Sequence, residues 1–236
     1  MSWIAEFRHV SKTFKGMEVL RDVNVTFEPG QIYGVVGPNG SGKSVLFRLL
    51  CGFTLPTAGE VRIHPDFRAR GAEFPQGFGV IIDGPGYVGH WSGLKNLVSL
   101  ARIRKLVDET AVRDTMTRLG LNPDSKTPVA RYSMGMKQKL AIAQATMEGQ
   151  QVLVLDEPFN ALDVASAALL TDLLRQHRAA GGTVIFASHR AEDIDQLADH
   201  TYHINDGRLE PVDTRSGQVS WSPQLGHAHR PAVTDE

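Results

Sequence analysis

The stretch Gly37-Pro38-Asn39-Gly40-Ser41-Gly42-Lys43-Ser44 decides the fold class of this chain. Two glycines separated by four residues and followed by Lys43 and Ser44 form the pattern of a phosphate-binding loop. Glycine lets the backbone curl tightly, so that amide N–H groups can line a phosphate. Lys43 is expected to reach the β- and γ-phosphates of a nucleotide, and the Ser44 hydroxyl is expected to bind Mg²⁺.

The residues on either side supply the strand and the helix that this motif requires. Residues 31–36 are predicted as a short buried strand, and residues 45–50 as a helix that ends near Gly52. The N-terminus of that helix would add unpaired N–H groups and the positive end of a dipole to the phosphate site. Its predicted buried face consists of Leu46, Leu49, Leu50 and Phe53. The alternative is a chance glycine-rich turn, which the flanking strand and helix disfavour.

The composition is that of an ordinary soluble globular protein. The chain has 236 residues, of which 42% are hydrophobic and 22% are charged, enough for one large domain or one domain with a subdomain. The net charge of −1 gives no indication of a nucleic-acid partner, and none is expected. Cys51 is the single cysteine, so no internal disulfide is possible, and a buried, inert thiol is expected. No apolar run approaches the roughly 18 residues of a membrane span, and the N-terminus lacks a secretion signal, so a cytosolic protein is predicted.

The N-terminal region is predicted as an antiparallel β region that leads into an α/β core. Residues 3–9 and 19–27 alternate apolar and polar side chains as strands do, and residues 11–16 between them are predicted as a turn. Further predicted elements are a strand at 60–64, a loop at 65–77 and a strand at 78–82 that ends at Asp83.

The rest of the chain alternates helices with buried strands. The block at about 84–147 is predicted as a helical insert, and residues 151–155 form an apolar run typical of a parallel strand covered on both faces. Further predicted elements are a helix at 164–180 with Leu169, Leu170, Leu173 and Leu174 inward, a strand at 183–187, a short helix at 192–199 and a strand–turn–strand at 202–209. Residues 1–213 are thus predicted as one domain, and residues 214–236 as a polar tail.

Asp156 and Glu157 follow the apolar run directly. An aspartate at the end of such a strand can hold Mg²⁺ through water, and Glu157 would then face the γ-phosphate and act as the general base for the attacking water. The alternative is a pair of acidic residues that caps a strand or opens a helix. The phosphate-binding loop elsewhere in the chain favours the catalytic interpretation.

The stretch Tyr132-Ser133-Met134-Gly135-Met136-Lys137-Gln138-Lys139-Leu140 precedes the Asp156 strand. It resembles the signature motif Leu-Ser-Gly-Gly-Gln of ATP-binding cassette (ABC) proteins. Three positions depart from that motif, namely Tyr132, Met134 and Met136. In the family, the serine hydroxyl and the glycine amides at a helix N-terminus contact the γ-phosphate of ATP bound to a partner subunit, and the resemblance assigns this role to Ser133 and Gly135. An ordinary helix cap by Ser133 is the alternative.

Three weaker matches follow the same family's order along the chain. Phe14 resembles the aromatic residue that stacks on adenine, although such a residue alone would more often be packing. Asn160-Ala161-Leu162-Asp163 resembles the loop that contacts the opposite subunit, which implies that Asp163 lies near the nucleotide. His189, after the strand at 183–187, resembles the switch histidine that senses the γ-phosphate.

Asp83 falls where the family usually has glutamine. A glutamine carbonyl can bind Mg²⁺ and its amide can orient water, whereas aspartate is shorter, fully charged and without a donor. We expect Asp83 still to reach the metal, directly or through water. A carboxylate here, together with the Ser-x-Gly-Met-Lys-Gln signature, resembles the ABC subunits that export lantibiotics, bacitracin-like peptides or other drugs.

The resemblance covers about residues 3–210 and implies an ATPase subunit of an ABC transporter. Its fold would be α/β, with a phosphate-loop core sheet, an antiparallel β subdomain and a helical subdomain. Two such subunits, identical or different, would sandwich two ATP molecules with Mg²⁺, head to tail. The implied catalytic residues are Lys43, Glu157 and His189, and the implied metal ligands are Ser44, Asp83 and Asp156.

The resemblance also implies a separate transmembrane permease, so that the chain would work at the cytoplasmic face of the membrane. The expected docking surface is the segment 83–100, with Tyr87, Val88 and Trp91 as contacts. The alternative is that these side chains fill the junction between subdomains. Two further alternatives concern function: a soluble ABC ATPase of the iron–sulfur assembly type, and a weakly hydrolysing nucleotide-binding partner.

Overall fold

The computed structural model describes residues 2–68, 71–84 and 86–212, so the predicted tail at 214–236 lies outside the described residues. The strands are β1 (Ala5–Phe14), β2 (Met17–Phe27), β3 (Ile32–Val36), β4 (Ala58–Ile63), β5 (Phe78–Ile81), β6 (Val152–Asp156), β7 (Thr183–Ser188), β8 (His200–Asn205) and β9 (Arg208–Val212). The helices are α1 (Lys43–Leu50), α2 (Gly93–Arg104), α3 (Glu109–Arg118), α4 (Met134–Thr146), α5 (Val164–Ala179) and α6 (Ala191–Asp195), with short 3₁₀ turns η1 (Pro65–Phe67) and η2 (Val129–Arg131). In this part of the chain no helix has the length and apolar character needed to cross a membrane.

Within the described residues the strands form two sheets. β2, β1 and β4 lie in this order in a three-stranded antiparallel sheet. The larger sheet has six strands in the order β5-β6-β7-β3-β8-β9, and its neighbours are parallel except for the β8–β9 hairpin. The predicted α/β fold, a parallel core sheet with a separate antiparallel sheet and a group of helices, is confirmed.

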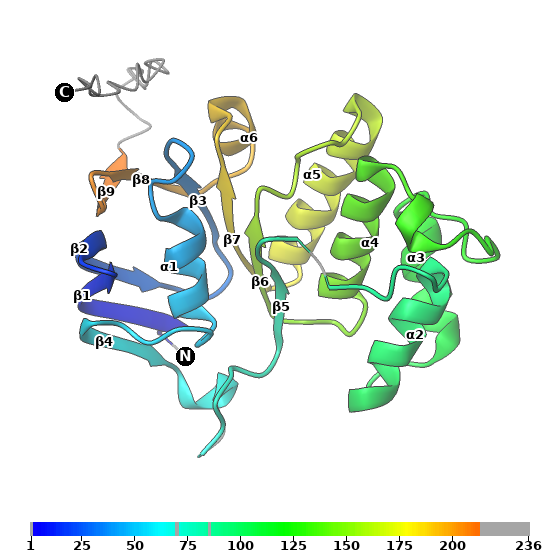
Figure 1. Cartoon of the computed structure of the whole chain (residues 1–236), viewed down its shortest axis with the longest axis horizontal. Helices are drawn as coiled ribbons and strands as arrows, with labels where there is room; N and C mark the ends of the chain where they lie inside the picture. The colour runs from blue at the N-terminus through cyan, green and yellow to red at the C-terminus, as the bar shows by residue number, and fades with distance from the viewer. Residues whose placement is uncertain (1, 69–70, 85, 213–236) are drawn as a thin grey trace, which may run out of the picture.

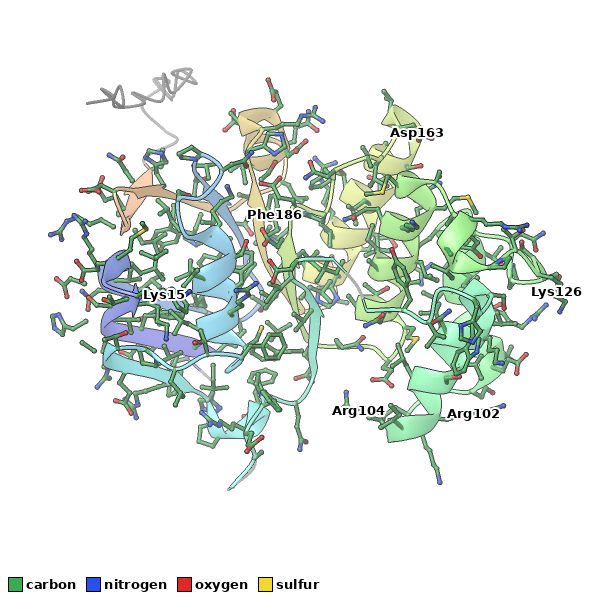
Figure 2. All side chains as sticks on the ribbon, in the orientation of Figure 1. Lys15, Arg102, Arg104, Lys126, Asp163 and Phe186 are labelled. Carbon is green, nitrogen blue, oxygen red and sulfur yellow. The ribbon has the colours of Figure 1, made fainter. Side chains whose placement is uncertain are left out.

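The six-stranded sheet separates two hydrophobic cores. Along β7, Val184 and Phe186 point into one core, whereas Ile185 and Ala187 point into the other. Figure 1 shows α1 between the two sheets, with α4 and α5 on the opposite face of the six-stranded sheet and α2 and α3 beyond them. Phe186 is fully buried and lies near the middle of the molecule in Figure 2. This burial on both faces explains the continuous apolar runs of the core strands.

The predicted turn at residues 11–16 is wrong for its first four residues, because β1 continues to Phe14. The pairing of β1 with β2 shifts register between Phe7 and Lys12, and His9 has a φ of 50°. Such bulges interrupt the two-residue alternation by which a strand is recognised in a sequence. Phe14 therefore lies at a strand end.

The predicted buried face of α1 is wrong at its last member. The helix ends at Leu50, and Gly52 follows with a φ of 76°. The helical repeat therefore does not extend to Phe53, whose side chain is 55% exposed. Cys51 is buried as predicted, and burial raises the pKa of its thiol to about 12, which makes it unreactive.

Two other helices differ from their predictions. In α5, Leu170 and Leu174 are buried, whereas Leu169 is 39% exposed, because the buried stripe follows the four-residue spacing. α6 ends at Asp195, four residues before the predicted end.

The predicted loop at 65–77 contains the 3₁₀ turn η1.

The parallel strands bring the candidate site together at one edge of the sheet. β5, β6, β7 and β3 are consecutive parallel neighbours, so their carboxyl ends meet there. The segments after these four ends carry Asp83, Glu157, His189 and the phosphate-binding loop, respectively. The helices α2, α3 and α4 come between β5 and β6 in the sequence and lie to one side of this edge (Figure 1).

Candidate functional site

Lys43 fills the inside of the phosphate-binding loop. Its Nζ atom donates hydrogen bonds to the carbonyl oxygens of Gly37 at 2.7 Å and Pro38 at 3.1 Å, and its side chain is 6% exposed. α1 begins at Lys43 after Gly42, whose φ of 108° suits glycine, and no side chain caps the helix. The amide groups at this helix start are therefore available for an anion.

Two details of the loop fit a phosphate group. The Oγ atom of Ser41 is buried and has no hydrogen-bond partner among the described residues. A Cβ atom on Gly37 would lie 2.7 Å from that Oγ atom, so glycine leaves the space that the serine occupies. A buried hydroxyl without a partner is costly unless a ligand supplies the acceptor.

Ser44 and Asp156 form the candidate metal site. The Ser44 hydroxyl donates to Oδ2 of Asp156 at 2.5 Å. Burial raises the pKa of Asp156, and the Ser44 hydrogen bond opposes that rise. These hard oxygen donors suit Mg²⁺, which takes one or two carboxylates from a protein and further ligands from phosphates and water. No three His, Cys, Asp or Glu side chains gather into a metal-binding group in residues 2–68, 71–84 and 86–212.

Glu157 lies between Lys43 and His189. Its Oε1 atom is 3.7 Å from the Lys43 Nζ atom. Its Oε2 atom is 2.8 Å from Nδ1 of His189 and also accepts the His189 backbone N–H at 3.3 Å. Oε1 is buried and accepts no hydrogen bond from the described part of the chain, and the backbone has a φ of 51°, which is rare outside glycine. A carboxylate that is hydrogen-bonded through only one of its oxygens can accept a proton from water through the other.

Gln138 is a site residue that the sequence analysis did not identify. It lies in the second turn of α4 and donates from Nε2 to the carbonyl oxygen of Pro158 at 2.9 Å. The helix that begins at the signature stretch is thereby tied to the loop that follows Glu157. The available signal in the sequence was the position of Gln138, five residues after Ser133.

Asp83 lies beside the candidate metal site but is paired with an arginine. Arg48 of α1 donates from Nε to Oδ2 of Asp83 at 2.9 Å, and its Nη2 atom contacts the same oxygen. Asp83 and Asp156 lie at the ends of the neighbouring parallel strands β5 and β6, and α1 contacts them through Arg48 and Ser44, respectively. Binding of the metal by Asp83 stays a prediction, and Arg48 is a second residue that the sequence analysis did not identify.

The signature residues lie against the loop before α5. The Ser133 hydroxyl caps α4 by accepting a backbone N–H of its first turn at 3.2 Å, so the expected cap is present. A Cβ atom on Gly135 would lie 2.7 Å from the carbonyl oxygen of Ala161. Asp163 caps α5 in the same way as Ser133 caps α4. Where the structure describes the chain, no hydrogen bond joins Ser133 or Asp163 to the phosphate-binding loop.

Phe14 is accessible at the end of β1, with 41% of its surface exposed. The Nζ atom of Lys12 lies 4.7 Å from the ring centroid and donates to the carbonyl oxygen of Leu55 at 2.7 Å. The cation covers one face of the ring, so a base would stack on the other face.

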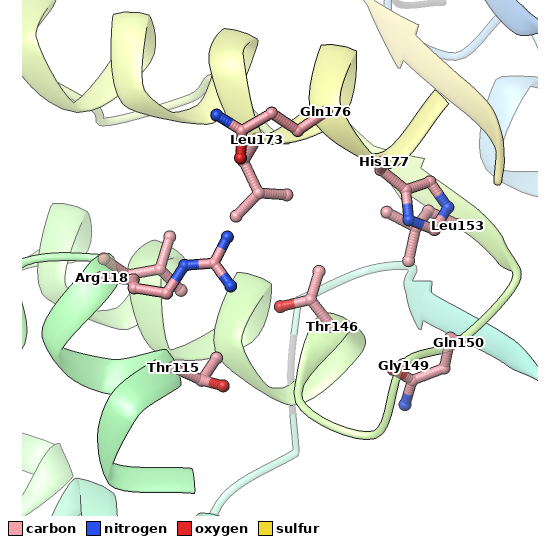
Figure 3. Close-up of a pocket in the computed structure, with 10 residues that line it drawn as sticks. Thr115, Arg118, Thr146, Gly149, Gln150, Leu153, Leu173, Gln176 and His177 are labelled. Atoms are coloured by element: carbon pink, nitrogen blue, oxygen red, sulfur yellow. The ribbon is translucent and has the colours of Figure 1, made fainter. Parts of the chain in front are cut away.

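A separate cavity of about 230 Å³ lies near the amino end of β6, at the opposite edge of the sheet from the phosphate-binding loop. Figure 3 shows side chains of α3, α4 and α5 around it, with the guanidinium of Arg118 pointing inward. His177 lines the same cavity, and burial lowers the pKa of its ring. None of the predicted site residues lines this cavity.

Known proteins that resemble the chain are named as ATP-binding proteins of ABC transporters or of transport systems. The model of the ABC transporter family matches residues 20–160. YybJ, an uncharacterized ABC transporter ATP-binding protein of Bacillus subtilis, is 38% identical over 205 residues, which are 87% of this chain and 94% of that protein. The bacitracin transport ATP-binding protein BcrA of Enterococcus faecalis is 31% identical over 211 residues, or 89% of this chain and 68% of that protein. The lantibiotic transport ATP-binding protein SrtF of Streptococcus pyogenes is 28% identical over 204 residues, which are 86% of this chain and 88% of that protein.

Solved structures show the same fold. An ATP-binding subunit of an ABC transporter superposes with a TM-score of 0.80 at 23% identity, over 90% of this chain and 91% of that one. The ATP-binding cassette MJ0796, in a dimeric post-hydrolysis state bound to ADP and Pi, superposes with a TM-score of 0.77 at 22% identity. The match covers 88% of this chain and 97% of that one. With the family match, the phosphate-binding loop and the site assembled around it, these likenesses show that the chain belongs to the ABC transporter family and carries its ATP-binding domain.

Proposed function

We propose that this chain hydrolyses ATP with Mg²⁺ and thereby energises export of a peptide or drug through a separate membrane subunit. One observation carries the hydrolytic part: Glu157 is hydrogen-bonded to His189 through one oxygen and faces Lys43 with the other, beside the Ser44–Asp156 pair. A protein that merely bound nucleotide would not need a buried carboxylate in this position.

In the proposed reaction, the chain's own residues position and stabilise the reacting groups. Lys43 exchanges its loop carbonyls for the β- and γ-phosphates, and Glu157 takes a proton from the water that attacks the γ-phosphorus in line. As the bond to the β–γ bridging oxygen breaks, His189 and Lys43 stabilise the negative charge on the transferred phosphoryl group. Ser44, Asp156 and Asp83 are the residues that would hold Mg²⁺, which supplies positive charge to the phosphates.

The proposed working unit is a dimer, homomeric or heteromeric. Ser133 and Gly135 lie at the start of α4 and have no contact with this chain's own phosphate-binding loop among the hydrogen bonds of the described residues. Their proposed partner is the nucleotide of a second subunit arranged head to tail, with Asp163 at the same interface. The dimeric state of MJ0796, a protein of similar fold, supports this arrangement.

The proposed permease contact is a groove between β5 and α2. It has a volume of about 390 Å³. Its lining includes Phe53, Val80, Ile82, Leu100, Ile103 and Arg104. Phe53 and Ile103 are exposed large apolar side chains, and an apolar membrane-subunit segment would cover them. Of the three contacts expected from the sequence, Val88 is exposed, Tyr87 packs against the core, and Trp91 is partly buried with the Nζ atom of Lys95 over its ring.

The proposed cargo is a peptide antibiotic or a similar drug, and the proposed location is the cytoplasmic face of the membrane. The names of BcrA and SrtF, which refer to bacitracin and lantibiotic transport, support a cargo of this class. The intact Lys43, Asp156, Glu157 and His189 argue against a weakly hydrolysing partner, for which the departures at Asp83 and Met134 leave room.

Co-purification tests the transporter assignment. The tagged chain is captured from native membranes solubilised in a mild detergent, and the bound proteins are identified by mass spectrometry. A polytopic membrane protein in stoichiometric amount is expected. Recovery of soluble partners alone would contradict the transporter assignment and favour an ABC ATPase of the iron–sulfur assembly type.

A further inference from the structure

Two side chains one turn apart on α1 contact the ends of two neighbouring strands. Ser44 donates to Asp156 at the end of β6, and Arg48 donates to Asp83 just after the end of β5. β5 and β6 are parallel neighbours, with Ile81 opposite Leu155. Residues four apart on a helix share a face, so one face of α1 holds both carboxylates.

The Arg48–Asp83 pair is open to solvent. The side chain of Arg48 is 41% exposed and that of Asp83 is 49% exposed. Exposed ion pairs contribute little to the stability of a fold, so this pair is easily exchanged for another partner. Both arginine donors contact the same oxygen of Asp83, Oδ2.

The charges around the candidate metal site explain why an arginine is needed there. The carboxylates are Asp83, Asp156 and Glu157, and the neighbouring cations are Lys43 and Arg48. With glutamine at position 83, the site would carry one negative charge fewer. Aspartate adds one negative charge, and Arg48 neutralises that charge while the metal is absent.

We propose that Arg48 neutralises Asp83 while the metal is absent, and that Asp83 exchanges Arg48 for Mg²⁺ when the nucleotide and its metal bind. This inference rests on the proposed ATPase function and goes beyond it by assigning a role to Arg48. Asp83 and the next residue, Gly84, both have left-handed φ values, of 57° and 83°.

A double-mutant cycle tests the exchange without measuring hydrolysis. The probe is Mn²⁺, whose binding to the full chain in the presence of ADP is followed by electron paramagnetic resonance. Arg48→Met removes the competitor, so Mn²⁺ should bind about three- to fivefold more tightly, the size of an exposed ion pair. Asp83→Ala should weaken Mn²⁺ binding. In the Asp83→Ala background, Arg48→Met should have no further effect, because Arg48 acts through Asp83.

Three controls separate the alternatives. Arg113→Met breaks another exposed pair, between α3 and Asp124, and should leave Mn²⁺ binding unchanged. ADP binding without metal should be unchanged in Arg48→Met; a loss there would show a direct phosphate contact by Arg48. Arg48→Lys, which keeps the charge but not the planar fork, should fall between the wild type and Arg48→Met and serves if the methionine variant does not fold.

Two results would overturn the inference. Arg48→Met could change Mn²⁺ binding equally in both backgrounds, which would show an effect of charge alone, or it could change it in neither. A wild-type chain that bound no Mn²⁺ with ADP would instead contradict the proposed function itself.

Discussion

The Nδ1 atom of His189 lies 2.8 Å from Oε2 of Glu157, across 32 residues of sequence. The two side chains follow neighbouring parallel strands, β6 and β7, and the backbone N–H of Glu157 donates to the carbonyl oxygen of Ala187 at 3.0 Å. The strand pairing therefore brings the proposed base and the proposed γ-phosphate sensor together without nucleotide. Preorganisation of this kind lowers the reorganisation needed during catalysis.

Lys43→Ala should abolish tight nucleotide binding. The Lys43 side chain is buried, and its Nζ atom is held inside the phosphate-binding loop by hydrogen bonds to two carbonyl oxygens. Its loss removes the positive charge that would make a charge-assisted hydrogen bond to phosphate. A loss of affinity of about 10- to 100-fold is expected for such a hydrogen bond. Titration of a fluorescent ATP analogue without metal measures it, with Lys126→Ala, an exposed lysine at the far end of the molecule in Figure 2, as the control. Equal affinity in both variants would contradict the role of Lys43.

Gly135→Ala should impair dimer formation more than nucleotide binding. The added Cβ would lie 2.7 Å from the carbonyl oxygen of Ala161, so the signature helix and the loop before α5 must move apart. Overpacking of this kind costs about 1–3 kcal/mol. Analytical ultracentrifugation with ATP checks the prediction, and Gly89→Ala, whose Cβ would make an ordinary contact at 3.5 Å with Ala130, is the control. A normal ATP-dependent dimer in Gly135→Ala would count against an interface at this position.

Phe14→Leu should weaken ATP binding, whereas Phe14→Tyr should not. The ring is accessible on the face opposite Lys12, and stacking of a base on an aromatic ring contributes about 1–3 kcal/mol. Leucine keeps most of the apolar surface but offers no π-face. Calorimetric titration with ATP distinguishes the two variants, and equal affinities would show that Phe14 has a packing role.

His177→Gln should reduce the loss of stability in acid. Burial lowers the pKa of His177 in the folded chain, so the unfolded chain binds the proton more readily. Stability is therefore full above the ordinary histidine pKa of about 6.5 and falls as the pH decreases through the lower folded value. Glutamine takes up no proton and can still donate to the carbonyl oxygen of Gln151, which His177 contacts at 3.3 Å. Urea unfolding measures the free energy of unfolding at neutral and at acidic pH, and the decrease between the two should be smaller in the variant. An equal decrease in variant and wild type would contradict the role of His177.

The local motifs of the site could be read from the sequence because each is continuous in the chain. The phosphate-binding loop and the Asp156–Glu157 pair each follow a short apolar strand, so residue type and context were visible together. The parallel pairing of β3, β6 and β7 then explains why these separate motifs converge.

The features that the sequence did not reveal depend on contacts between distant segments. Arg48 and Asp83 are 35 residues apart, so their pairing leaves no local pattern. Gln138 stands in the signature stretch, but the carbonyl that it contacts is 20 residues away. The wrong prediction of a turn at residues 11–14 has a different cause. The bulges of β1 break the alternation of apolar and polar residues within the strand itself.

The central claim is that Glu157 removes the proton from the attacking water, and Glu157→Gln tests it most directly. Glutamine keeps the shape of the side chain and can still bond to His189, but it cannot accept a proton. Single-turnover hydrolysis of ATP with Mg²⁺ should slow by about 100-fold or more, the usual contribution of a general base, while ATP binding persists and the dimer accumulates. Turnover close to that of the wild type would contradict the account.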